Sequence, residues 1–115
     1  MVKIEDPFPK LELELRRGAI VLAALSQLTQ AQYGYSLRQA LAARGMEIEE
    51  GTLYPLLRRL EAQGVLVSEW RTGEGSPRRY YQLSESGQAL YARLANSWQA
   101  LGAVMDGLVK DGSGQ

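Results

Sequence analysis

One stretch of the sequence, GTLYPLLRRLEAQG at residues 51–64, constrains the fold of the chain more than any other. Its leucines recur at the spacing i, i+3, i+4 and i+7: Leu53, Leu56, Leu57 and Leu60. This spacing follows the turn of an α-helix, so it gathers four apolar side chains on one face. The stretch therefore predicts a helix that packs against a core through its leucines and ends at Gly64.

The opposite face of this predicted helix is polar. At about 100° per residue, Pro55 points away from the leucines. Four further residues flank it, Thr52 and Arg59 on one side and Tyr54 and Arg58 on the other. Hydroxyl and guanidinium groups hydrogen-bond to phosphates and base edges, which makes this face a candidate for nucleic-acid contact. An ordinary solvated helix face with surface arginines is the alternative that the stretch alone leaves open.

The amino-acid composition excludes most classes of enzyme. The chain of 115 residues has no Cys and no His, so it offers no thiol nucleophile, no imidazole base and no zinc site of the usual kinds. No Gly-rich phosphate loop is present either. A carboxylate pair remains possible among 13 acidic residues, but these are scattered along the chain. We therefore expect no enzyme and no cofactor or metal, with a carboxylate hydrolase as a minor alternative.

Charge and hydropathy indicate a single soluble domain. The formal net charge is zero, which argues against a protein that coats nucleic acid by bulk charge but allows one local basic patch. Apolar residues make up 45% of the chain, enough for one modest core, and no apolar run reaches the length of a membrane span. The N-terminus lacks the pattern of a signal peptide. These features predict a cytoplasmic protein with no membrane partner.

Further helices are expected before the leucine helix. Residues 1–10, with two prolines, predict a flexible N-terminal arm. A helix is expected over about residues 10–28, because its second half is apolar nearly all round. Another is expected over about residues 35–44, with Gly45 as its stop. Met46 and Ile48 alternate with charged residues, which predicts a short strand.

A β-hairpin and a long helix are expected after it. The segments VLVSEWRT and RRYYQL are typical of strands, and the turn TGEGSP joins them. Tyr80 and Tyr81 in the second strand are expected to pack. Ser84 is a good N-cap for a last helix over residues 84–109, and residues 110–115 predict a disordered tail. The fold class is thus mainly α with a small β-hairpin, in the order of a winged helix-turn-helix over residues 11–83.

The last helix carries a heptad pattern. Its apolar residues are spaced 3, 4, 3, 4 and 3 apart: Tyr91, Leu94, Trp98, Leu101, Met105 and Leu108. Such a seam is typical of helices that pair with another helix, and a two-fold mate would cover it. Packing on the first helix of the same chain is the alternative, and we expect some of both. The sequence therefore predicts a homodimer formed through the C-terminal helix.

Three motifs carry a resemblance to a known family. They are YGYSLRQAL at residues 33–41, GTLYPLLRRLEAQG at residues 51–64, and SEW followed by RRYYQLSESG at residues 68–70 and 78–87. In this order and spacing, the sequence resembles the PadR family of bacterial transcriptional regulators, in its short-tailed branch, over about residues 11–109. The resemblance implies a homodimeric repressor that binds an inverted repeat in double-stranded DNA.

The resemblance also implies a set of DNA-facing residues. They are Tyr35 and Ser36 on the second helix, Thr52, Tyr54, Pro55 and Arg59 on the third, and Arg78 and Arg79 on the wing. We expect the wing arginines to contact phosphates or the minor groove, and Thr52 and Pro55 to reach base edges in the major groove. Tyr54 is expected to combine a half-buried ring with a hydroxyl that reaches a phosphate.

Trp98 has a second possible role. Short-tailed PadR-like proteins can hold planar aromatic molecules between paired tryptophans, and Trp98 resembles that position, with Ala95 and Gly102 leaving room beside its ring. The resemblance thus implies a planar aromatic effector that alters operator affinity. Simple interface packing is the alternative for Trp98. For the whole chain, the alternative function is a winged-helix dimer that serves as a protein interaction module without DNA binding.

Overall fold

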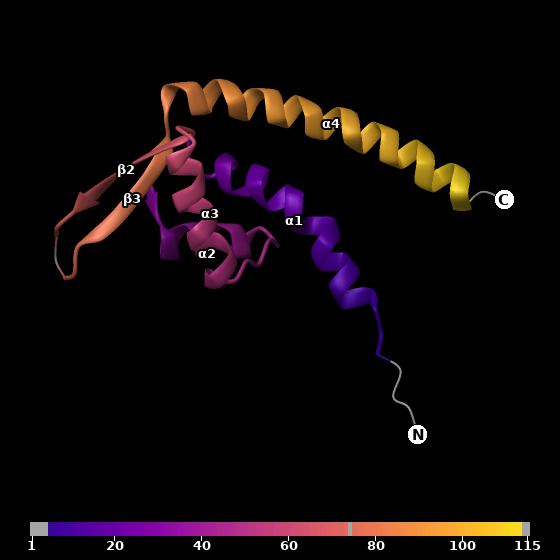
Figure 1. The fold of residues 1–115 in the computed structure, drawn as a ribbon, viewed down its shortest axis with the longest axis horizontal. Helices are drawn as coiled ribbons and strands as arrows, with labels where there is room; N and C mark the ends of the chain where they lie inside the picture. Colours follow the sequence, from indigo (N-terminus) through magenta and orange to yellow (C-terminus); the bar gives the residue numbers. More distant parts are fainter. Residues whose placement is uncertain (1–4, 74, 114–115) are drawn as a thin grey trace.

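The computed structural model of the chain describes residues 5–73 and 75–113 and contains helices with one small sheet (Figure 1). The elements follow in the order α1 (Phe8–Ser26), β1 (Gln32–Tyr33), α2 (Gly34–Ala43), α3 (Glu50–Ala62), β2 (Leu66–Arg71), β3 (Arg78–Leu83) and α4 (Glu85–Ser113). The predicted fold class, mainly α with a β-hairpin in winged helix-turn-helix order, is confirmed, and the sheet gains one strand.

The leucine face of α3 lies in the core, as its spacing predicts. Leu53, Leu56, Leu57 and Leu60 are all buried. They belong to one cluster with apolar side chains from α1, α2, the hairpin strands and the connecting segments: Ile20, Ala24, Leu25, Leu28, Leu37, Leu41, Ile48, Val65, Leu66, Tyr81 and Leu83. A single core therefore holds α3 against the rest of the domain and leaves its opposite face outside.

Two glycines end the helices of the helix-turn-helix, at the predicted positions. Gly45 and Gly64 have φ angles of 95° and 80°, which L side chains rarely adopt. After α2, the N–H groups of Gly45 and Met46 donate to the carbonyls of Ala42 and Leu41, a pattern that closes the last turn of a helix. These sharp stops fix where α3 begins and where the hairpin leaves it.

The sheet is antiparallel, with strand order β1-β3-β2. In the hairpin, Leu66 lies opposite Leu83 and Arg71 opposite Arg78, so the register runs without a break from the core to the tip. The short strand β1 lies between the two predicted helices, where the sequence predicts no strand, and it pairs with β3 through Gln32 and Tyr33. The middle of β3 is thereby paired on both sides, with β1 and with β2.

The prediction of a strand at Met46 and Ile48 is wrong. Both residues lie in the connection between α2 and α3. The N–H of Met46 closes α2, and the carbonyl of Ile48 accepts a hydrogen bond from Arg38 Nε at 3.2 Å. Ile48 still buries its side chain. The alternation of apolar and charged residues arises because Ile48 is buried in a turn. The N–H of Met46 and the carbonyl of Ile48 are hydrogen-bonded outside any strand.

The ends of the chain are more helical than expected. α1 begins at Phe8, inside the stretch predicted to be a loose arm, and ends at Ser26 rather than near Leu28.

The N–H of Gly87 donates to Ser84 Oγ at 2.9 Å, which confirms the predicted N-cap of α4. The prediction of disorder is wrong for residues 110–113, because adding residues to a formed helix avoids the cost of nucleation. Residues 1–4 and 114–115 lie outside the described residues.

The outer parts of α1 and α4 project from the core (Figure 1). The radius of gyration is 17.5 Å, whereas a compact domain of this length would have about 13 Å. Large apolar side chains stand exposed on both helices: Phe8, Leu11, Leu13 and Leu15 on α1, and Trp98, Leu101, Val104, Met105, Leu108 and Val109 on α4. None of the helices in the described part of the chain combines the length and hydropathy that crossing a bilayer requires.

Candidate DNA-binding interface

The outward face of α3 is open along its first three turns. Thr52, Pro55 and Arg59 are exposed, and a Cβ added at Gly51 would meet no atom within 4 Å. Pro55 lies inside α3, beyond its first turn, and has no N–H to donate, so the carbonyl of Gly51 loses its usual intrahelical partner. The helix can therefore bring its backbone and these side chains close to a flat or grooved partner.

A groove of about 430 Å³ lies between α3 and the hairpin. It is lined by Tyr33, Gly34, Tyr35, Tyr54, Leu57, Arg58, Trp70, Arg78, Arg79 and Tyr81. Three of these residues are arginines, and among the described lining residues none is acidic. In a chain with no net charge, this groove is therefore a local concentration of positive charge and aromatic rings.

Tyr54 sits at the floor of this groove in the half-buried position that the sequence predicts. Its ring packs against the core cluster, while it also lines the groove. The ring passes so close to Gly34 that a Cβ there would lie 2.4 Å from Tyr54 Cε1. Gly34, the first residue of α2, thus makes room for an aromatic ring at the meeting point of α2, α3 and the hairpin.

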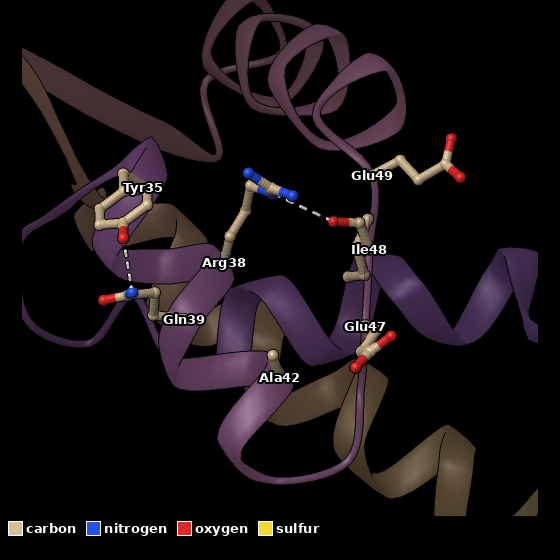
Figure 2. Close-up of a pocket in the computed structure, with 7 residues that line it drawn as sticks. All are labelled: Tyr35, Arg38, Gln39, Ala42, Glu47, Ile48 and Glu49. Atoms are coloured by element: carbon tan, nitrogen blue, oxygen red, sulfur yellow. Dashed lines mark hydrogen bonds between the residues drawn. The ribbon is translucent and has the colours of Figure 1, made fainter.

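The two candidate residues on α2 differ in exposure. Tyr35 is exposed, and its hydroxyl accepts a hydrogen bond from Gln39 Nε2 at 2.7 Å, which leaves the hydroxyl proton free for another acceptor (Figure 2). Ser36 is half-buried and donates its hydroxyl proton to the carbonyl of Tyr33 at 3.0 Å. Tyr35 is therefore well placed to donate to a phosphate, whereas Ser36 mainly holds the start of α2.

Arg38 ties the turn between α2 and α3 together. Figure 2 shows its side chain reaching from α2 to the connecting loop, where Nε donates to the carbonyl of Ile48. Its Nη1 also pairs with Glu50 Oε1 at 3.0 Å, at the first residue of α3. Arg38 and Ile48 line a second hollow of about 430 Å³. The contacts of Arg38 with Ile48 and Glu50 fix the position from which α3 starts.

The exposed face of the hairpin carries two arginines that lie over aromatic rings. The guanidinium of Arg78 is 4.5 Å from the ring centroid of Tyr33, and that of Arg71 is 4.3 Å from the centroid of Tyr80. Arg71 also pairs with Glu69 at 2.7 Å. No ion pair is found for Arg78 among the described residues. Arg78 is therefore the wing arginine with its charge available to a partner.

Arg79 lies on the other face of β3 and is already paired. Its Nη2 is 2.7 Å from Glu61 Oε1 at the end of α3, and its Nε donates to Ser68 Oγ at 3.0 Å. The sequence grouped Arg78 and Arg79 as equivalent wing contacts. Adjacent residues of a strand point to opposite faces. Both arginines line the groove, but of the two only Arg79 has an ion pair with α3 among the described residues.

The seam of α4 divides into two parts. Tyr91 and Leu94 are half-buried against the core cluster, whereas Leu101, Met105 and Leu108 are exposed. Trp98, at the boundary, has 51% of its surface exposed. Its ring lines two hollows between α1 and α4, of about 370 and 310 Å³, and Ala95 lines the larger one. A Cβ added at Gly102 would meet nothing within 4 Å, so space remains beside the ring.

The structure thus brings part of the predicted set together. Tyr35, Tyr54, Arg78 and Arg79 line one groove, whereas Ser36, Thr52, Pro55 and Arg59 do not. The groove also contains residues that the predicted site left out: Tyr33, Arg58 and Trp70. The signal for Arg58 was present, because its helical position puts it on the same flank as Tyr54. Tyr33 gave no such signal, since its role depends on the pairing of β1 with β3.

Comparison with known proteins bears directly on this interface. The model of the transcriptional regulator PadR-like family matches residues 21–93. The transcriptional regulator Rv3488 of Mycobacterium tuberculosis is 42% identical over 77 residues, which are 66% of this chain and 72% of that protein. The family model includes the whole span from α2 to the hairpin. The match to Rv3488 covers 66% of this chain.

Solved structures are similar over nearly the whole chain. The crystal structure of a PadR family transcriptional regulator from Eggerthella lenta has a TM-score of 0.84 and 43% sequence identity, and the match covers 90% of this chain and 92% of that one. A transcriptional regulator from Clostridium thermocellum has a TM-score of 0.77 and 28% identity, covering 84% and 99%. These similar proteins are regulators, which confirms the expectation that the chain is not an enzyme.

Proposed function

The chain belongs to the PadR-like family of transcriptional regulators, and we propose that it acts as a homodimeric repressor whose two α3 helices read an inverted repeat. DNA binding by a winged helix-turn-helix follows from the family. We propose four further properties: the symmetry of the operator, the residues that contact it, the direction of regulation and the effector.

The main support for the proposal is the groove between α3 and the hairpin. Arg58, Arg78 and Arg79 line it, and no ion pair is found for Arg58 or Arg78 among the described residues, whereas Arg79 is paired with Glu61. A basic patch next to an exposed helix is the electrostatic footprint of a protein that binds nucleic acid locally. This supports placing α3 in the major groove and the wing beside the adjacent backbone.

Within this arrangement, each candidate residue has a role suited to its exposure. Thr52 and Pro55 would meet base edges, with the ring of Pro55 against a thymine methyl group. Tyr35, Tyr54, Arg59 and Arg78 would contact phosphates. Ser36 would support these contacts by fixing the start of α2.

The exposed apolar surfaces of α1 and α4 support the homodimer. Leu101 borders a hollow between α1 and α4 but is still exposed, and Met105 and Leu108 continue the exposed seam after it. A second copy would cover these side chains with its own, since a two-fold interface uses the same surface on both subunits. The paired subunits would then present two α3 helices about one turn of DNA, ~34 Å, apart.

Trp98 supports an effector site at the same interface. Its ring borders two hollows whose described lining residues carry no charged side chain. A planar, uncharged aromatic molecule would fit between the two Trp98 rings of a dimer better than an ion would. Its binding would change the spacing of the α3 helices and release the operator, and the protein would act on DNA in the cytoplasm.

Salt-dependent DNA binding tests the proposal. A labelled duplex, enriched by the protein from a random library, is titrated at several salt concentrations. A repressor that neutralises several phosphates loses affinity steeply, with a slope of about −0.9 per phosphate in a double-logarithmic plot. A winged-helix dimer that serves only as a protein interaction module would enrich no duplex and show no such slope. In transcription assays, the repressor should lower transcript yield from a promoter that carries the enriched sequence.

A further inference from the structure

Three side chains from three elements form a closed hydrogen-bonded cluster beside the groove. Arg79 of β3 binds Glu61 of α3 through Nη2 and Oε1 at 2.7 Å. The hydroxyl of Ser68 in β2 donates to Glu61 Oε2 at 2.5 Å and accepts a hydrogen bond from Arg79 Nε at 3.0 Å. Each carboxylate oxygen of Glu61 is thus used by a different strand of the hairpin.

The cluster is shielded from water on several sides. The side chains of Arg79 and Glu61 are only 37% and 27% exposed. The guanidinium of Arg79 also lies 5.9 Å from the ring of Trp70 and 5.5 Å from the ring of Tyr81. A shielded pair of this kind keeps its geometry better than an exposed one and is less screened by salt.

The position of the cluster matters because the hairpin has few other polar ties to α3. Among the described residues, no other side-chain hydrogen bond joins α3 to the strands β2 and β3. The core anchors the hairpin through Leu66 and Leu83, which face each other in the register, and through Tyr81, which lies opposite Ser68. The strand β1 pairs with β3 as far as Tyr80. Toward the tip, Trp70 and Arg78 are exposed. The cluster lies where the buried part of the hairpin ends and the exposed part begins, so it can set the angle of the exposed part relative to α3.

We propose that Glu61, Ser68 and Arg79 form a wing clamp, which holds the hairpin at the angle to α3 that DNA binding requires. The clamp rests on the proposed DNA-binding function and assigns Arg79 a positioning role instead of a phosphate contact. Arg58 of α3 and Arg78 of β3 line the same groove from opposite sides. One DNA duplex can engage both only if the two elements are fixed relative to each other, so holding them in advance lowers the cost of binding.

Removing the carboxylate of Glu61 tests the clamp, because charge and positioning predict opposite results. Loss of a negative charge beside DNA should, on charge alone, strengthen binding. The clamp predicts instead that Glu61→Ala weakens binding to the enriched duplex by about five- to tenfold, the order expected for losing a preorganised element. Glu69→Ala is the matched control, since Glu69 pairs with Arg71 within the hairpin and makes no tie to α3. It should leave affinity unchanged or raise it.

A charge exchange separates the clamp from a direct phosphate contact. Ser68 both donates and accepts, so it can bridge the pair in either orientation. The double variant Glu61→Arg with Arg79→Glu should regain affinity to within about threefold of the wild type, whereas Arg79→Glu alone should lose about tenfold or more. Its salt slope should match that of the wild type. If Arg79 binds phosphate, the exchanged variant will bind as poorly as Arg79→Glu, with a slope reduced by about 0.9.

The outcomes distinguish the clamp from the function on which it rests. Wild-type protein that enriches no duplex would overturn DNA binding, and the clamp with it. Wild-type binding with a Glu61→Ala variant that binds as tightly as Glu69→Ala would overturn the clamp alone. Melting temperatures of each variant show whether the domain folds, and if Glu61→Ala unfolds, the charge exchange decides the result.

Discussion

The ring of Tyr54 occupies the space in which any side chain at Gly34 would have to fit, since a Cβ there would lie 2.4 Å from Tyr54 Cε1. Gly34 is the first residue of α2, and Tyr54 lies in the second turn of α3. The contact is a close approach between the two helices of the helix-turn-helix. It determines how deeply the ring of Tyr54 sits beneath the groove.

Gly34→Ala should therefore destabilise the domain and weaken DNA binding. The ring cannot yield toward the core without overpacking it, which costs about 1–3 kcal/mol, or a fall of several degrees in melting temperature. Thermal unfolding followed by circular dichroism at fixed protein concentration measures this. Gly51→Ala is the control, because a Cβ there meets nothing within 4 Å, and its melting temperature should not fall. Equal stability of both variants would refute the tight contact.

Arg78→Ala should weaken binding to all duplexes by a similar factor. Its guanidinium lies over the ring of Tyr33 and faces the groove, so it is expected to bind a phosphate and to carry little sequence preference. The salt slope should decrease by about 0.9. Arg93→Ala, which removes the same charge from the exposed surface of α4, should leave the slope unchanged. Equal slopes for the two variants would rule out a phosphate contact at Arg78.

Leu101→Glu should separate the dimer into monomers. Leu101 is exposed in the single subunit, on the face of α4 that carries the heptad seam. In the proposed homodimer two glutamates would lie near each other across the two-fold axis, and such like-charge repulsion costs several kcal/mol. Sedimentation analysis should show a monomer. Ala103→Glu, on the opposite face of the helix, should stay dimeric. A Leu101→Glu variant that sediments as a dimer would move the interface elsewhere.

Trp98→Ala should abolish the binding of flat aromatic dyes but preserve DNA binding. The large ring borders both hollows between α1 and α4, and its loss removes the stacking surface. The test uses a Trp70→Phe background, in which Trp98 is the remaining tryptophan of the chain. A dye that fits beside Trp98 should quench its fluorescence. Dye binding that survives in Trp98→Ala, detected by dye anisotropy, would place the effector site elsewhere.

Much of the fold could be predicted because it depends on local patterns. The leucine spacing of α3, the stops at Gly45 and Gly64, and the N-cap at Ser84 each act within a few residues, and each is found as predicted. The strand β1 could not be predicted, because two residues carry no periodicity of their own. It exists because β3 pairs with it, and that pairing spans almost fifty residues of sequence.

The candidate site was predictable only in part, for a similar reason. Helical geometry and family resemblance selected Tyr54 and Arg78 as DNA-facing candidates, and both line the groove. Neither could separate Arg78 from Arg79, because the difference depends on which face of β3 meets Glu61. The register of the hairpin against α3 decides that point, and a sequence pattern does not contain it.

The proposed function requires two α3 helices that read DNA as a symmetric pair, and the sequence of the enriched duplexes tests this requirement most directly. Selection from a random library, followed by sequencing, should yield an inverted repeat with half-site centres about one helical turn, 10–10.5 base pairs, apart. Substitutions at Thr52 or Pro55 should change the preferred bases in both half-sites equally. An enriched sequence with a single unpaired half-site, or no enrichment at all, would contradict the account.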